Sequence, residues 1–209
     1  MKKINLGFLA SFRGTNMQAI VDACKAGRLA ANPVVVISNN GEAKALERAM
    51  AEGIPGYHIG SAAFPDPDEL DRLITNTLLE HEAELVILAG YMKKIGPYLL
   101  ETYQGRILNV HPSLLPRFGG RGMYGRHVHE AVIAAGEKES GATIHLVVGE
   151  YDTGPILAQR KLTVQEQDTP EMLAERILPV EHELYVETIH RIISGDLKLD
   201  SYSIEQSRG

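Results

Sequence analysis

Two side chains near the middle of the chain have the types and spacing needed to stabilise a developing negative charge. Asn109 and His111 lie two residues apart in and just after an apolar stretch, Ile107 to Val110, which predicts a buried strand. Because side chains alternate along a strand, these two should point the same way. Pro112 and Pro116 follow, and they should end the strand in a stiff turn. An amide and an imidazole on such a turn suit a carbonyl oxygen that becomes an oxyanion.

A structural interpretation fits the same residues. Asn109 could equally be a buried amide whose hydrogen bonds are satisfied, and His111 a surface histidine. A catalytic role therefore has to be argued from a complete site and not from these two residues alone. Asp152 is a further candidate, because a carboxylate near His111 would favour its charged form and raise its pKa. Alternatively, Asp152 is a turn residue before Thr153-Gly154-Pro155.

A second kind of site is predicted near the N-terminus, where a strand runs directly into a helix. Gly14, Thr15 and Asn16 stand at that junction. Free backbone N–H groups and the helix dipole there attract an anion, and glycine lets a phosphate approach the backbone. The stretch has neither the dinucleotide glycine pattern nor a Walker lysine, so a plain strand-to-helix turn is the alternative.

The elements that must position these residues alternate between short strands and helices. Apolar runs predict strands at 4–10, 34–37, 57–59, 85–89, 107–110, 143–148 and 156–164. Helical spacing predicts helices from Thr15 or Asn16 to Gly27, at 43–51, from Asp66 to Leu79, at 129–135 and from Thr169 to Ile193, with a kink at Pro179. This order predicts an α/β fold with a doubly wound, mostly parallel sheet and helices on both faces. Ligands of such sheets lie beyond the carboxyl ends of the strands, where Gly14, Gly90 and His111 should converge.

Composition limits the class of protein. The 209 residues predict a single domain, 1–209, with a normal globular composition. The net charge of −6 argues against nucleic acid as a partner. No apolar run reaches the length of a membrane span, and the single cysteine, Cys24, favours a reducing compartment. We therefore expect a cytoplasmic protein with small-molecule partners, either a monomer or a homodimer. The scattered histidines predict no metal site.

The motif Asn109-x-His111-Pro-Ser-Leu-Leu-Pro116, followed by Tyr151-Asp152-Thr153-Gly154-Pro155, resembles the folate-dependent formyltransferases. The resemblance covers nearly the whole chain, from Leu6 to about Leu197. It implies the Rossmann-like fold of that family and transfer of a formyl group from 10-formyltetrahydrofolate, as co-substrate, to the amine of 5-phosphoribosylglycinamide in purine synthesis. Other members act on an amino sugar nucleotide or on methionyl-tRNA, and the latter would need a further C-terminal domain. A non-catalytic nucleotide-binding module is the alternative outside the family.

The resemblance also implies roles for individual residues. It gives the catalytic roles to His111, Asn109 and Asp152, and it places the substrate phosphate on Gly14, Thr15 and Asn16 and the substrate amine on Glu181. Thr143 matches a residue that orients a water. The implied folate-binding residues are Met92, Lys93, Lys94, Ile95, Val148, Gly149, Glu150, Tyr151 and Asp152.

Two features depart from the family pattern. Pro67 stands where the family has an arginine, so that contact is absent or supplied elsewhere. The loop 117–126 is longer than in familiar members and holds four glycines within 119–125. We expect this loop to be mobile when the site is empty and to order as a lid over bound ligands. A surface loop that is already packed is the alternative.

Overall fold

One seven-stranded sheet forms the centre of the computed structural model, which describes residues 3–202. The strand order is β3-β2-β1-β4-β5-β6-β7, and the pairs from β3 to β5 are parallel while β5–β6 and β6–β7 are antiparallel. The strands are β1 (Ile4–Ala10), β2 (Ala31–Ser38), β3 (Gly56–His58), β4 (Leu85–Leu88), β5 (Ile107–His111), β6 (Glu139–Leu146) and β7 (Ile156–Thr163).

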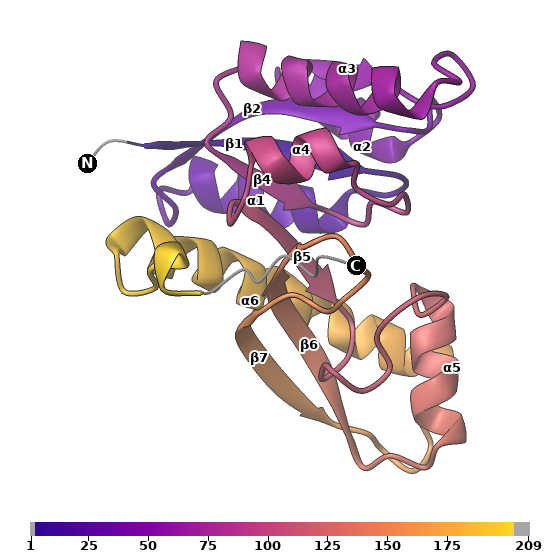
Figure 1. The fold of residues 1–209 in the computed structure, drawn as a ribbon. Coiled ribbons are helices and arrows are strands. Elements are labelled where there is room, and N and C mark those ends of the chain that lie inside the picture. The colour runs from indigo at the N-terminus through magenta and orange to yellow at the C-terminus, as the bar shows by residue number, and fades with distance from the viewer. Residues whose placement is uncertain (1–2, 203–209) are drawn as a thin grey trace.

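Helices cover both faces of this sheet (Figure 1). They are α1 (Thr15–Lys25), α2 (Lys44–Ala51), α3 (Pro67–Glu80), α4 (Pro97–Thr102), α5 (Arg126–Ala134) and α6 (Pro170–Ser194), with a short 3-10 turn at Leu199–Ser201. Side chains of α1, α2 and α6 belong to one apolar core and those of α3 and α4 to another. The predicted doubly wound α/β fold is therefore confirmed. That all 209 residues make one domain stays a prediction, which the continuous sheet supports.

The first helix begins differently from our expectation. We expected Thr15 or Asn16 to cap it, but the cap position belongs to Gly14, which has a left-handed backbone (φ 63°) and makes no side-chain cap. A Cβ on Gly14 would lie 2.7 Å from the Cβ of Ala45, at the start of α2. Glycine is therefore needed here both for its backbone conformation and for its small size.

Other elements also differ from the sequence-based prediction. The helix α4 was missed because it is only six residues long, and Asp71 of α3 stabilises its start by accepting from the Tyr98 and Leu99 backbone amides. The strand β6 begins at Glu139, four residues earlier than predicted. The helix α6 has nearly the predicted bounds and continues through Pro179 as one element, and the kink at Pro179 stays a prediction.

The switch from parallel to antiparallel pairing occurs at β5, the strand that carries the predicted oxyanion donors. In the β5–β6 register Asn109 lies opposite His145, and His111 lies opposite Thr143. A register irregularity with β7 falls between Ile144 and His145. The neighbours of Asn109 and His111 are therefore set by an antiparallel partner that begins about thirty residues later.

Candidate active site

His111 closes strand β5 and is almost fully buried, with 3% of its surface exposed. Its Nε2 atom lies 2.7 Å from the Phe118 carbonyl oxygen, and its Nδ1 atom lies 3.4 Å from Oδ2 of Asp152. Both partners are hydrogen-bond acceptors, so a ring with a single proton would direct one lone pair at an oxygen. The contacts of the ring therefore favour its doubly protonated form.

Burial acts in the opposite direction. It lowers the pKa of His111 below the ordinary value, and this effect exceeds the upward contributions of Asp152 and the Phe118 carbonyl. Our expectation of a net upward shift is therefore wrong, although the contribution of Asp152 has the expected sign. The physical reason is the depth of the ring, which the sequence around Pro112 does not reveal.

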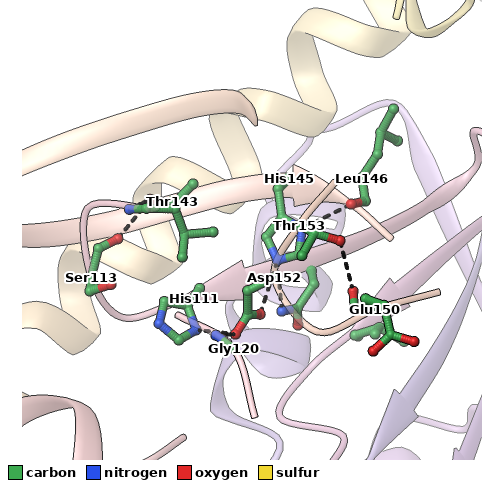
Figure 2. Close-up of polar contacts among 12 residues, drawn as sticks. His111, Ser113, Gly120, Thr143, His145, Leu146, Glu150, Asp152 and Thr153 are labelled. Atoms are coloured by element: carbon green, nitrogen blue, oxygen red, sulfur yellow. Dashed lines mark hydrogen bonds and ion pairs between the residues drawn. The ribbon is translucent and has the colours of Figure 1, made fainter. Parts of the chain in front are cut away.

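Asp152 lies between two imidazoles (Figure 2). Its Oδ2 faces His111 and accepts from the Gly120 backbone N–H at 3.0 Å, and its Oδ1 lies 3.4 Å from Nε2 of His145. Burial alone would raise the pKa of Asp152, but these contacts lower it overall. Asp152 is therefore an anion that accepts from the Gly120 backbone amide and lies between His111 and His145.

The loop that carries Asp152 folds back tightly on β6. Asp152 itself has a left-handed backbone (φ 57°), and the Leu146 amide donates to the Pro155 carbonyl. A Cβ on Gly154 would lie only 1.8 Å from the Leu146 carbonyl oxygen. The small size of Gly154 therefore allows the return that brings Asp152 to His111.

His145 also belongs to this cluster. Its Nε2 atom is 3.0 Å from Nδ2 of Asn109, and its Nδ1 atom is 2.9 Å from the Leu146 carbonyl oxygen. The residue is 2% exposed. Its place on the same face of β6 as Thr143 was visible in the sequence, but its pairing with Asn109 depends on the β5–β6 register.

The Thr143 hydroxyl is held by contacts within the protein, and the water that the resemblance implies for it stays a prediction. Its hydroxyl donates to the Ser113 carbonyl and accepts from the Leu115 amide and from Gln159. The side chain is fully buried, and Figure 2 shows it beside Ser113. Thr143 thus fixes the turn that follows His111, and these protein contacts already use the hydroxyl.

A cavity of about 520 Å³ opens next to this cluster. Seven of the predicted site residues line it, together with Gly90, His129 and much of the glycine-rich loop: Asn16, Met92, Asn109, His111, Tyr151, Asp152 and Glu181. The structure therefore brings the predicted oxyanion donors together with residues from the first and last long helices.

Glu181 of α6 and Asn16 of α1 are in direct contact where they line this cavity. The Asn16 Nδ2 atom donates to Glu181 Oε2 at 2.8 Å. Burial raises the pKa of Glu181 to about 7, against a smaller opposing effect of Asn16. Four residues later on the helix, the buried Tyr185 hydroxyl contacts the Leu88 and Leu108 carbonyls at 3.2 and 2.8 Å, which anchors α6 to β4 and β5.

His129 is a cavity residue to which we assigned no role. It is 5% exposed, and its Nδ1 atom has no hydrogen-bond partner among the described residues. Burial and the nearby His111 lower the pKa of His129 to about 4, so the ring is neutral near pH 7. The His127-x-His129 spacing was visible in the sequence, but only the docking of α5 shows which histidine is inside.

The remaining predicted folate residues do not all line the same cavity. Lys93, Lys94 and Ile95 border a second cavity of about 280 Å³, together with Pro67. Lys94 also forms an exposed 2.7 Å ion pair with Glu150. Tyr91 lines both cavities, so the two hollows adjoin at this residue. Val148 and Gly149 belong to the loop between β6 and Asp152 but border neither cavity.

Gly14 and Thr15 lie at the N-terminus of α1 but do not border the 520 Å³ cavity, unlike Asn16. Within residues 3–202, no group of three or more His, Cys, Asp or Glu side chains is arranged to hold a metal ion. None of the helices in that range is both long and apolar enough to cross a membrane.

Comparison with known proteins agrees with this combination of sheet and site. The family described as formyl transferase matches residues 4–189, most of the chain, and the chain belongs to that family. Two curated relatives that match most of this chain are phosphoribosylglycinamide formyltransferases. The phosphoribosylglycinamide formyltransferase of Escherichia coli K12 is 34% identical over 94% of this chain and 90% of its own length. That of Bacillus subtilis is 37% identical over 92% and 95%.

A solved structure gives the same result. The glycinamide ribonucleotide transformylase 1 of Symbiobacterium toebii superposes with a TM-score of 0.87 and 39% identity, covering 93% of this chain and 89% of that one. Within the family, these sequence and structural similarities are therefore to the phosphoribosylglycinamide formyltransferases.

Proposed function

We propose that the protein transfers the formyl group of 10-formyltetrahydrofolate to the amine of 5-phosphoribosylglycinamide, a step of purine synthesis. The observation that carries this proposal is the cluster of Asn109, His111 and Asp152 in the lining of a cavity that Glu181 also lines. The identity of the relatives supports the choice of substrates.

The reaction follows from the positions of these groups. The substrate amine attacks the formyl carbon, a C–N bond forms, and the carbonyl oxygen becomes an oxyanion. Donors on His111 and Asn109 stabilise that oxyanion, and Asp152 keeps the His111 ring oriented and favours its charged form. When the bond from carbon to the folate nitrogen breaks, the proton lost by the amine ends on that nitrogen, relayed by water.

The other residues supply binding. The N-terminus of α1 at Gly14, Thr15 and Asn16 offers free backbone N–H groups to the substrate phosphate. Glu181, with its pKa near 7, is placed to accept a hydrogen bond from the amine or to take its proton. The folate ring is covered by the segment from Met92 to Ile95 and by the loop from Val148 to Asp152.

Small molecules are thus the proposed partners, and nucleic acid and membrane lipid are not. We propose a cytoplasmic location from the reducing environment that the single cysteine favours.

A direct assay tests the function. The purified protein is given 10-formyltetrahydrofolate and either phosphoribosylglycinamide or an amino sugar nucleotide, and formylated product and free formate are both measured. We expect formylation of the ribonucleotide alone. Formylation of the sugar would select a different member of the family, release of formate without product would indicate that water is the acceptor, and binding without turnover would leave only a binding module.

A further inference from the structure

His145 contacts both catalytic side chains that the proposed mechanism needs in fixed orientations. It lies opposite Asn109 in the antiparallel β5–β6 pair, with Nε2 3.0 Å from the Asn109 Nδ2 atom and 3.4 Å from Asp152 Oδ1. Its other ring nitrogen, Nδ1, lies 2.9 Å from the carbonyl oxygen of Leu146.

The two hydrogen bonds of the ring, to Leu146 and Asn109, suggest an assignment of its protons. The Leu146 carbonyl can only accept, so Nδ1 of His145 carries a proton. In the neutral ring Nε2 then presents its lone pair, and the Asn109 NH₂ group, at 3.0 Å, lies nearer to it than Asp152 Oδ1, at 3.4 Å. This is the neutral ring in a single tautomer, and the backbone carbonyl of the next residue selects it.

That tautomer determines which end of the Asn109 amide faces the ring. A proton on Nε2 would require an acceptor there, and the amide would turn its oxygen toward His145. With the lone pair on Nε2, the amide turns its NH₂ group, and His145 uses only one of the two N–H bonds. The second N–H bond remains for an oxyanion in the cavity that Asn109 lines.

We propose that His145 is a positioning residue for formyl transfer, which fixes the Asn109 amide as a donor through a tautomer set by the Leu146 carbonyl. The proposal rests on the proposed function, in which Asn109 stabilises the oxyanion. His145 need not touch the substrate, and it acts through Asn109.

A double-mutant cycle separates this role from a merely structural one. The turnover number, kcat, is measured for the wild type, Asn109→Ala, His145→Phe and the double variant. We expect His145→Phe to lower kcat about 10-fold, the effect of losing one hydrogen bond of about 1.4 kcal/mol, with little change in either KM. The double variant should match Asn109→Ala, because the proposed role of His145 acts through Asn109 and not through its contact with Asp152. A further 10-fold loss in the double variant would show that His145 acts independently of Asn109 and would overturn the proposal.

Two further variants control this experiment. His145→Gln keeps an acceptor near the Nε2 position, and it should recover most of the lost kcat; no recovery counts against the proposal. Ile144→Val alters the adjacent, fully buried residue of β6, which packs in the apolar core, and should leave kcat unchanged. A loss there equal to that of His145→Phe would mean that kcat responds to any damage to β6.

Nitrogen NMR of the wild type tests the assignment without any variant that must fold. At pH 7 the His145 ring should show a protonated Nδ1 and an unprotonated Nε2, and a proton on Nε2 would overturn the proposal. The wild-type formylation assay is read separately. If it shows no transfer, the proposed function fails, whereas a wrong tautomer or additive variants in an active enzyme overturn only the role of His145.

Discussion

At the scale of single residues, the site depends on two donors that belong to one strand but have different partners. Asn109 is oriented by His145, whereas His111 is held between the Phe118 carbonyl and Asp152. Both side chains are thus held in fixed orientations beside the reacting groups. Substitution of either one should therefore lower the rate of the chemical step more than it weakens substrate binding.

Removing either donor tests this directly. His111→Ala and Asn109→Ala should each lower kcat by about 10²-fold or more, the effect expected for one oxyanion donor. Circular dichroism and thermal unfolding should show folded proteins, because both side chains lie at or near a strand end. Near-normal turnover in a folded His111→Ala protein would contradict the mechanism.

The charge of Asp152 should control the titration of His111. Asp152 raises the pKa of His111 against the larger effect of burial, so Asp152→Asn should lower this pKa further. If the charged ring is the active form, the alkaline limb of the kcat profile should move to lower pH. NMR titration of the His111 ring in both proteins measures the shift, and equal pKa values would refute the coupling.

The sequence predicted much of this cluster but not its internal connections. Asn109 and His111 could be placed at a strand end because alternation and two prolines mark it. The contact with His145 could not be predicted, because it requires the register between strands that are separated by a long loop and a helix. The depth of His111 and His129 likewise depends on how α5 and the loop before it pack.

At the scale of elements, the start of α1 is the clearest case of a geometry that only glycine permits. Gly14 and Gly27 both have left-handed backbones near the two ends of the same helix, with φ of 63° and 70°. A Cβ at Gly14 meets Ala45 at 2.7 Å, whereas a Cβ at Gly27 meets nothing within 4 Å. Gly14 and Gly27 therefore share a backbone conformation but differ in the space around them, so the same substitution can be compared at both positions.

Alanine at these positions should have unequal effects. Both substitutions add similar backbone strain, of about 1 kcal/mol. Gly14→Ala should in addition displace the helix N-terminus and weaken binding of the ribonucleotide, while Gly27→Ala should leave that binding unchanged. Isothermal titration measures both affinities. Equal affinities would place the substrate phosphate elsewhere.

The glycine-rich loop 117–126 is tied to the catalytic residues at one end only. The Phe118 carbonyl accepts from His111 and the Gly120 amide donates to Asp152, but Tyr124 is 53% exposed. The Phe118 carbonyl is hydrogen-bonded to Nε2 of His111, the ring nitrogen that an oxyanion would need as a donor. We therefore expect ligand binding to displace this contact and to rearrange the loop.

Hydrogen exchange measures that rearrangement. Amides within residues 118–126 should exchange readily in the free protein and become protected when the ribonucleotide and a folate analogue are both bound. The amides of α3, remote from this loop, serve as an internal reference. Exchange that is unaffected by both ligands would mean that the loop does not act as a lid.

At the scale of the whole molecule, the site depends on the contact between the first and last long helices. Glu181 has a pKa of about 7 in the folded protein, above its ordinary value of 4.5. Between these values the folded state holds a proton that the unfolded state has released, so this group lowers stability as the pH rises through this window.

Glu181→Gln should remove that loss. The free energy of unfolding of the variant should increase relative to the wild type between about pH 4.5 and 7, as followed by urea denaturation at several pH values. Glu183→Gln changes the same charge at an exposed position on the same helix and serves as the control. A constant difference between Glu181→Gln and wild type across this range would show that the carboxyl group does not titrate there.

The hydrogen bond from Asn16 to Glu181 also bears on the order in which the site can form. It joins residues 165 positions apart, so α1 leaves the ribosome long before its partner exists. Until α6 arrives, Met17, Ile20 and Val21 lack part of the apolar core that buries them. A nascent chain with the complete His111 turn would still present an open groove on this face of the sheet. The last long helix is thus both the final wall of the cavity and the cover of the first helix, and catalytic competence should begin at the moment this groove closes.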